Sequence, residues 1–415
     1  MGVQLGVIAD DFTGGTDIAS FLVANGVKTI QLSGTGHAAS FDEDVQAIVV
    51  SLKSRSKPAH EAIEQSLEAL ELLRSAGARQ IFFKYCSTFD STPQGNIGPV
   101  TDALLSALDE QFTVVCPALP VNGRTTYQGV LFVNGVPLNE SGMRNHPVTP
   151  MTDSNLVRLM DGQAQGSTGL VPVDVVEQGA AAVGDALAAL KAAGHRYAVL
   201  DALNDKHLNV LGEAVAGLRL VTGGSGLGGA MARALPAAVK EQHAGFAPKT
   251  GPAVILSGSC SVMTNAQVAD YKAKAPSLEV DVDRLMTSPQ GYDGEVLAWF
   301  KDQPGSGRAP LIFATAGPDE VRRLQQTYGS AESSQAIERF FARIATELVA
   351  GGVQRMIVAG GETSGSVTTA LGIDGFEVGD PIAPGVPWVR SLDGRLDLAL
   401  KSGNFGTTDF FIQAQ

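Results

Sequence analysis

Short runs of apolar residues alternate with longer stretches in which apolar residues recur every three or four positions, through most of the chain. The short runs have the length and the Val, Ile and Leu content of buried strands. They include residues 5–9, 45–52, 80–85, 113–118, 197–200, 253–256 and 356–359. In one longer stretch Ile63, Leu67, Leu70 and Leu73 share one face of a helix. Repeated strand–helix units predict an α/β fold with largely parallel sheets.

The alternation stops between about residues 236 and 252, where Pro236 and Pro248 stand among polar residues. A chain of 415 residues is also too long for one ordinary hydrophobic core. We therefore predict two domains, residues 1–240 and 250–415, each a largely parallel, Rossmann-like sheet flanked by helices. We expect the active site in the cleft between them, because such folds bind ligands at the carboxyl ends of their strands.

Glycine-rich loops directly follow three strand-like runs after residue 250. They carry Ser257, Gly258 and Ser259, then Gly360, Gly361, Glu362 and Thr363, and finally Ser402, Gly403 and Asn404. Loops without bulky side chains let backbone N–H groups reach an anion, and a following helix adds its positive end. On one sheet edge they would form a phosphate cradle, where Glu362 can hold Mg²⁺ and Thr363 can bind phosphate. Acidic residues are also common in any first helical turn.

Asp10 and Asp11 follow the first strand-like run, and Thr13 comes shortly after them. Adjacent carboxylates at a strand end can accept hydrogen bonds from sugar hydroxyls, hold a metal ion or act as a general base. Helix capping is the structural alternative. It accounts for Thr16 or Asp17, at the start of a helix predicted over residues 17–25, and leaves Asp10 and Asp11 unexplained. We therefore favour a functional role for the two carboxylates.

Two further segments of the first half carry polar residues suited to a hydroxylated acid. The loop over residues 84–96 combines Lys84, Asp90 and Ser91 with further hydroxyls, as a polyol-binding surface would. An ordinary turn rich in Ser, Thr and Asp explains this loop equally well. Farther along, Arg124 and Arg144 can each grip a carboxylate through two parallel hydrogen bonds.

Residues 224–229 read Gly-Ser-Gly-Leu-Gly-Gly and satisfy the G-x-G-x-x-G pattern of dinucleotide-binding folds. Those folds also place an acidic residue at the end of the next strand, whereas residues 253–256 lead into Ser257. The fingerprint is therefore incomplete, and an NAD(P)-dependent oxidoreductase of a small sugar acid stays an alternative function. A sugar-acid receptor without catalytic activity is a second alternative, although such receptors are usually exported.

The formal net charge of −13 and the sequence pI of about 4.9 limit the partners of the chain. An acidic surface repels nucleic acid and anionic lipid, so we expect neither nucleic acid nor a membrane as partner. The three cysteines form no C-x-x-C pair, which suits a reducing compartment. Because the N-terminus lacks a basic signal-peptide segment and no apolar run approaches the ~20 residues that span a bilayer, we expect a cytoplasmic protein. The composition is compatible with a monomer and with a homodimer.

Several of these segments together resemble the four-carbon acid sugar kinase family, most closely its 3-oxo-tetronate kinase branch. The segments that carry the resemblance are residues 8–14 (Ile-Ala-Asp-Asp-Phe-Thr-Gly), Asp90-Ser91-Thr92 with Gly95-Asn96, and residues 139–147, 151–155, 360–365 and 400–406. They extend over nearly the whole chain. One departure concerns Gln94, because the wider family often has Arg at the corresponding place.

The resemblance implies an ATP-dependent kinase that also uses Mg²⁺. Its N-terminal domain would bind the sugar acid and its C-terminal domain ATP, with Ser257 or Ser259, residues 360–363 and Gly403 as nucleotide contacts. The implied reaction phosphorylates the terminal C4 hydroxyl of a four-carbon sugar acid, 3-oxo-tetronate, to its 4-phosphate.

The roles of the remaining candidates follow from that reaction. Asp10 or Asp11 would orient the hydroxyl and accept its proton, because phosphoryl transfer depends on positioning and on charge neutralisation. Because Gln94 stands where the wider family often has Arg, Lys84, Arg124 and Arg144 are the residues expected to hold the carboxylate of the substrate.

Overall fold

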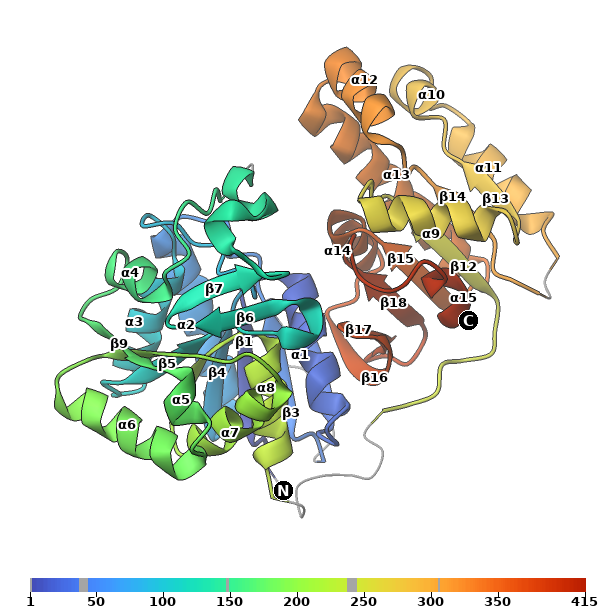
Figure 1. The fold of residues 1–415 in the computed structure, drawn as a ribbon. Coiled ribbons are helices and arrows are strands. Elements are labelled where there is room, and N and C mark those ends of the chain that lie inside the picture. The colour runs from blue at the N-terminus through green and yellow to red at the C-terminus, as the bar shows by residue number, and fades with distance from the viewer. Residues whose placement is uncertain (1, 37–43, 147–148, 237–244, 305–306) are drawn as a thin grey trace. The chain divides into compact units, whose positions relative to one another are not determined.

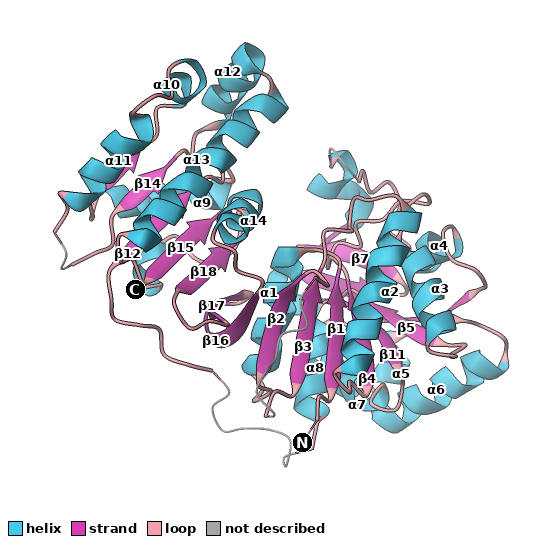
Figure 2. Ribbon diagram, turned by 180° about the vertical axis from the view of Figure 1, so that it is seen from behind, coloured by secondary structure: helices cyan, strands magenta, loops and turns pink. Residues whose placement is uncertain are grey.

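Two compact units make up the chain, residues 1–244 and residues 245–415, and each is described by itself. The computed structural model describes residues 2–36, 44–146, 149–236, 245–304 and 307–415 (Figure 1). In both units strands form a sheet and helices lie against it (Figure 2), which confirms the predicted α/β fold.

Parallel strands form the sheet of the N-terminal unit, in the order β2-β3-β1-β4-β11-β5-β10-β9. Their bounds are β1 Leu5–Ala9, β2 Thr29–Ser33, β3 Ala47–Ser51, β4 Gln80–Lys84, β5 Thr113–Cys116, β9 Thr168–Val171, β10 Tyr197–Leu200 and β11 Leu220–Gly223. Because these strands run in the same direction, the loops that follow them meet at one edge of the sheet. That edge carries Asp10, Asp11 and Lys84.

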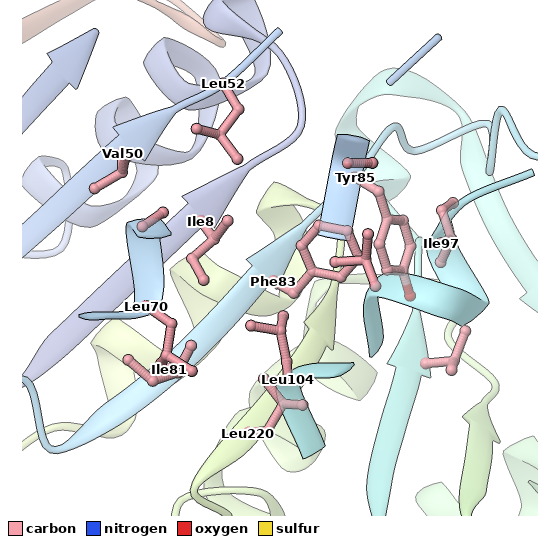
Figure 3. Packing of buried hydrophobic residues seen from close by; sticks show 14 of the residues in the cluster. Ile8, Val50, Leu52, Leu70, Ile81, Phe83, Tyr85, Ile97, Leu104 and Leu220 are labelled. Carbon is pink, nitrogen blue, oxygen red and sulfur yellow. The ribbon is translucent and has the colours of Figure 1, made fainter. Parts of the chain in front are cut away.

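Helices cover both faces of this sheet (Figure 2). Their bounds are α1 Phe12–Val23, α2 Ala59–Ser75, α3 Ile97–Ala107, α4 Leu156–Asp161, α5 Val173–Val176, α6 Ala180–Ala192, α7 Asp205–Ala214 and α8 Ser225–Ala234. On the face covered by α2 and α3, Ile8, Ile81, Phe83 and Leu104 belong to one apolar cluster (Figure 3). The strands are buried on both faces, which explains their continuous apolar runs.

A small antiparallel sheet follows β5 in the chain. Its strands are β6 Arg124–Tyr127, β7 Val130–Val133 and β8 Val136–Pro137, preceded by the 3-10 helix η1 Pro120–Asn122 and followed by η2 Leu138–Glu140 and η3 Gly142–Asn145. Asn134 and Gly135 have φ angles of 50° and 83°, and they form the hairpin turn that the Asn-Gly pair predicts. Asp201 fastens the small sheet, because its carboxylate accepts hydrogen bonds from the backbone N–H groups of Gln128 at 2.7 Å and Gly129 at 2.9 Å.

The C-terminal unit has parallel strands in the order β13-β14-β12-β15-β18, followed by the antiparallel β17 and β16. The strands are β12 Ala253–Ser257, β13 Ser277–Glu279, β14 Leu311–Phe313, β15 Arg355–Ala359, β16 Gly375–Ala383, β17 Val386–Ser391 and β18 Asp397–Lys401. The helices are α9 Val262–Lys272, α10 Val282–Thr287, α11 Tyr292–Lys301, α12 Pro318–Tyr328, α13 Ser330–Ala350, α14 Gly361–Ala370 and α15 Phe410–Gln413. Since β12, β15 and β18 are neighbours, the three predicted glycine-rich loops meet at one edge.

Two glycine-rich segments lie at the beginnings of helices. α1 starts at Phe12 instead of residue 17, and α8 starts at Ser225, within the glycine pattern of residues 224–229. Glycine is a poor helix former, but it lets neighbouring groups approach closely. A Cβ on Gly228, for example, would lie 2.6 Å from the side chain of Ile18 in α1. Tertiary packing overrides helix propensity at these places.

The substitution Gly212→Ala tests the close packing of α7 against α8. An added Cβ would lie 2.5 Å from the carbonyl carbon of Ala230, so the two helices would have to move apart. Although Ala favours helices, we expect a loss of about 1–3 kcal/mol in the free energy of unfolding, measured by thermal denaturation.

The matched substitution is Gly184→Ala in α6, where nothing lies within 4 Å of the added Cβ. There the gain in helix propensity should raise stability by about 0.5–1 kcal/mol. Equal stabilisation at both positions would contradict the tight α7–α8 contact.

Candidate functional site

The guanidinium of Arg55 lies against two carboxylates at the carboxyl edge of the N-terminal sheet. Its Nε and Nη2 donate to Oδ2 and Oδ1 of Asp10 at 2.9 Å and 2.7 Å, and Nη2 also donates to Oδ1 of Asp11 at 2.5 Å. The two acids follow β1, and Arg55 lies in the loop after the neighbouring strand β3. The bidentate pair fixes the plane of the guanidinium. We call Asp10, Asp11 and Arg55 the carboxylate cluster.

The two acids of the cluster differ in pKa and in exposure. Burial raises the pKa of Asp10 against the opposing charge of Arg55. Burial acts in the same direction on Asp11, but Arg55, Lys84 and local hydrogen bonds outweigh it and lower the pKa of that carboxyl. The side chain of Asp10 is 5% exposed and that of Asp11 is 26% exposed. Asp11 is therefore the carboxylate of the cluster that a ligand can reach.

Asp11 is also the N-cap of α1. Its Oδ1 accepts a hydrogen bond from the backbone N–H of Gly14 at 2.9 Å, and its Oδ2 accepts one from the hydroxyl of Thr13 at 2.8 Å. The expectation that capping accounts only for Thr16 or Asp17 is therefore wrong, because the helix begins earlier. Capping leaves lone pairs on a carboxylate, so it does not exclude a contact with substrate.

Lys84 ends β4 with its ammonium against the first turn of α1. The residue is 4% exposed, and a Cβ on Gly14 would lie 2.6 Å from its Nζ. Its charge acts on Asp10, on Asp11 and on Asp17. Its ammonium makes no hydrogen bond within the part of the chain that the structure describes. A compact cation with N–H groups to spare is suited to an anionic ligand.

Asp17 is a candidate that the sequence analysis missed, because it was explained there as a cap. Its Oδ2 accepts a hydrogen bond from the hydroxyl of Ser225. Its Oδ1 is buried and has no partner among the described residues, as is the case for Nε of Arg124 in β6. Burial raises the pKa of Asp17, and the charges of Lys84 and Arg124 oppose that shift. Unpaired buried polar atoms of this kind are expected where water or a ligand binds.

The other predicted substrate residues have different surroundings. Thr88 donates to Oδ1 of Asp90 at 2.6 Å, and the buried Ser91 donates to Oε1 of Gln163 at 2.9 Å. Arg144 is exposed in η3 and makes no ion pair with the residues that the structure describes. The structure therefore brings Lys84 and Arg124 into electrostatic contact with the acids, and it leaves Ser91 and Arg144 outside that group.

In the C-terminal unit, loops that lack side chains pack directly on one another. Gly360 has a φ of 127°, and a Cβ there would lie 3.2 Å from the backbone nitrogen of Ser259. A Cβ on Gly258 would collide with the hydroxyl of Thr363. The N–H of Ser259 donates to the carbonyl of Ala359 at 3.1 Å. The loops after β12 and β15 are thus locked together through their backbones.

The loop after β18 is held at the same edge through the carbonyl of Gly403. This oxygen accepts hydrogen bonds from the hydroxyl of Ser261 at 2.7 Å and from Nζ of Lys401 at 2.9 Å. Lys401 is fully buried, and burial lowers its pKa to about 7. Ser257 is buried as well, with its hydroxyl 2.6 Å from that of Thr315, so its side chain faces the interior.

A pocket of about 250 Å³ lies beside these loops. Its polar side consists of residues 258–260 and 360–363. Its apolar side comes from α12 and α13 and includes Val321, Leu324 and Ile337. The sequence analysis missed these three residues, because apolar positions on a helix face are typical of any protein core.

The residues that line the pocket fit an anion held by backbone groups, with a metal cation beside that anion. Among its described lining residues no side chain is cationic, whereas Glu338 and the exposed Glu362 line it. An anion there would contact backbone N–H groups and the N-terminus of α14. No group of three or more His, Cys, Asp or Glu suited to a metal ion is found in the described parts of the chain. Mg²⁺ needs only one or two carboxylates when phosphate oxygens complete its shell, so Glu362 fits such an ion.

Comparison with known proteins divides the chain at the same place as the fold. Residues 5–231 match the family model of a sugar-binding N-terminal domain. Residues 254–411 match the family model of a nucleotide-binding C-terminal domain.

Curated relatives match over nearly their full length. A 3-oxo-tetronate kinase of Brucella melitensis is 58% identical over 418 residues, which cover 100% of this chain and 95% of the relative. The 3-oxo-tetronate kinase of Haemophilus influenzae is 54% identical and covers 99% of both chains. The one of Salmonella typhimurium is 54% identical over 100% of this chain and 99% of the relative.

Solved structures also match over nearly the whole chain. A Salmonella typhimurium protein described as a tRNA synthase has a TM-score of 0.93 at 54% identity, over 99% of this chain and 98% of that one. A Haemophilus influenzae protein has a TM-score of 0.87 at 54% identity over 99% of both chains. A Bordetella bronchiseptica protein with bound citrate, a domain-swapped dimer, is 26% identical over 100% of this chain and 98% of that one, with a TM-score of 0.50. From these matches, the chain belongs to the four-carbon acid sugar kinase family, as a full-length relative of the 3-oxo-tetronate kinases.

Proposed function

We propose that the protein is an ATP-dependent kinase that phosphorylates the terminal C4 hydroxyl of 3-oxo-tetronate and forms the 4-phosphate. The observation that carries this proposal is the full-length similarity to 3-oxo-tetronate kinases, which reaches 58% identity in the Brucella melitensis relative. The chemistry of the two units supports it. Carboxylates with cations beside them suit a hydroxylated acid, and a pocket lined by glycine loops suits a nucleotide.

In this proposal Asp11 orients the C4 hydroxyl and accepts its proton, because it is the more exposed acid of the carboxylate cluster. Asp10 holds Arg55 in place. Lys84 and Arg124 provide positive charge for the carboxylate of the substrate. Substrate contacts from Thr13, Asp90, Ser91 and Arg144 stay predictions. Asp90 and Ser91 already make hydrogen bonds within the protein, which favours a supporting role for the loop that carries them.

We place ATP in the pocket of the C-terminal unit. Backbone N–H groups of residues 361–363 at the start of α14, together with the loops at Ser259 and Gly403, would hold its phosphates, and Val321, Leu324 and Ile337 would contact its adenosine. The N–H groups of Gly258, Ser259 and Gly360 donate to carbonyls of the same unit, so these residues would shape the cradle. Glu362 would hold Mg²⁺, which when bound neutralises part of the phosphate charge. The side chain of Ser257 faces inward, so its contribution would come from its backbone.

The glycines that suggested an oxidoreductase have a packing role. A Cβ on Gly226 would lie 2.6 Å from the carbonyl oxygen of Ala118, and a Cβ on Gly229 would lie 3.0 Å from the ring of Phe21. Close approach of α8 to the segment that follows β5 and to α1 therefore explains the pattern without a dinucleotide, and we do not retain that alternative.

The proposal includes a small-molecule partner and a homodimer in the cytoplasm, where ATP is available. The Bordetella bronchiseptica relative was crystallised with a carboxylic acid, citrate, and as a dimer. No helix in the described part of this chain has the length and apolar character of a membrane span.

Release of ADP from ATP and Mg²⁺ tests the proposal, with 3-oxo-tetronates, threonates and erythronates of both configurations as acceptors. We expect the highest kcat/KM with a 3-oxo-tetronate. Turnover with none of these acids, in protein that binds ATP, would mean that the acceptor has been assigned wrongly. Protein that does not bind ATP would remove the kinase assignment altogether.

The substitution Asp11→Asn should lower kcat by about 10²–10⁴-fold, because Asn cannot accept the proton of the hydroxyl. The KM for ATP should change little. Asp44→Asn is a suitable control, since Asp44 is 56% exposed in an ion pair with Lys28, and it should leave kcat unchanged. Near-normal kcat in both Asp10→Asn and Asp11→Asn would show that neither acid is the base.

The substitution Gly360→Ala should weaken ATP binding by about tenfold, which corresponds to about 1.4 kcal/mol. The new Cβ would push against the loop that carries Ser259, in addition to straining a φ of 127°. Gly372→Ala is the matched control, because φ is also positive there, at 62°, and nothing lies within 4 Å. Titration calorimetry should show a weaker Kd only for Gly360→Ala; equal affinity in the two variants would contradict the cradle.

A further inference from the structure

Arg55 has donors left over after it has bound both acids. A guanidinium carries five N–H bonds. The N–H of Nε and one of Nη2 point to Asp10, and the second N–H of Nη2 is available for Asp11. Nη1 makes no hydrogen bond with any residue that the structure describes. With 23% of its side chain exposed, Arg55 therefore presents two N–H groups at the edge where Asp11 is accessible.

The backbone of the Arg55 loop is held from two neighbouring strand ends. The N–H groups of Ser54 and Arg55 donate to the carbonyl of Asp10 at 2.9 Å and 3.1 Å. From the loop after β4, Nδ2 of the buried Asn96 donates to the carbonyls of Ser54 at 2.8 Å and Lys57 at 3.0 Å. A donor group fixed in this way needs no reorganisation when charge develops next to it. Arg55 is therefore a preorganised hydrogen-bond donor.

Arg55 remains charged in this environment. Burial lowers its pKa, but the two carboxylates outweigh burial and raise the pKa well above the ordinary value. The cluster therefore keeps a permanent cation beside the acid that accepts the proton.

We propose, on the basis of the proposed kinase function, that Arg55 is a catalytic residue whose Nη1 donates hydrogen bonds to the phosphoryl group during transfer. Asn96 is a positioning residue that acts through Arg55. The C4 oxygen forms the new bond to the γ-phosphorus while the bond from that phosphorus to the bridging oxygen of ADP breaks. The hydroxyl proton passes to Asp11, and Arg55 donates hydrogen bonds without losing a proton.

The position of Arg55 separates this role from carboxylate binding. Its Nη2 contacts Asp11, the proposed acceptor of the C4 hydroxyl proton, at 2.5 Å. The carboxylate and the terminal hydroxyl are at opposite ends of a four-carbon acid. A guanidinium next to the proton acceptor is therefore next to the phosphorus that the hydroxyl attacks, and Arg124, whose charge acts on Asp17, is left for the carboxylate.

Steady-state kinetics of Arg55→Lys and Arg55→Ala test the proposal. We expect kcat to fall by about 10²–10³-fold in each, with the KM values for ATP and for 3-oxo-tetronate within about threefold of wild type. Added guanidinium should restore part of the activity of Arg55→Ala. A normal kcat in Arg55→Lys would overturn the proposal. So would an increase confined to the KM for 3-oxo-tetronate, which would make Arg55 a carboxylate ligand.

The role of Asn96 is tested by a double-mutant cycle with Asn96→Ala and Arg55→Lys, with thermal denaturation of each variant as the check on folding. Asn96→Ala should lower kcat by about tenfold in the wild type and have little further effect in Arg55→Lys. Equal losses in both backgrounds would mean that Asn96 does not act through Arg55. If wild-type protein showed no turnover with any four-carbon acid, the proposed acceptor would be wrong and this inference would fail with it.

Discussion

Two adjacent carboxylates are tolerated at the buried end of β1 because one guanidinium lies against both of them. Removing one partner from a buried ion pair typically costs about 3–5 kcal/mol, since the remaining charge is left without compensation. Two other features of this sheet edge are connected with the contact between Arg55 and the two carboxylates. Asp11, held by Arg55, caps α1, and the glycine in the first turn of α1 leaves room for the ammonium of Lys84. The N-terminal site is therefore one connected electrostatic unit.

The C-terminal site depends on a different constraint, the absence of side chains. Gly258 and Gly360 let two loops meet through their backbones, and the carbonyl of Gly403 ties the third loop to Ser261. Because no cationic side chain lines the described pocket, an anion there would be bound by backbone dipoles. One unit thus offers charged side chains and the other offers backbone amides.

Much of the fold could be predicted from the sequence, because strands buried on both faces leave continuous apolar runs and glycines mark the loops after them. The start of α1 could not be predicted, since Gly14 and Gly15 are poor helix formers whose use becomes clear only from the side chains that pack on them. Arg55 was missed for another reason. It lies 44 positions from Asp11, and a single Arg in a polar loop has no motif that would connect it to the acids. Such a contact depends on the order of the strands in the sheet.

The proton-coupled ³¹P spectrum of the reaction product tests the central claim most directly, namely that the phosphoryl group reaches the terminal hydroxyl of the acid. 3-Oxo-tetronate has hydroxyls only at C2 and C4. The account predicts a new phosphomonoester signal split into a triplet by the two protons on C4. A doublet would place the phosphate on C2 and contradict the proposed orientation of the substrate. Signals of ADP and inorganic phosphate alone would show hydrolysis of ATP without transfer.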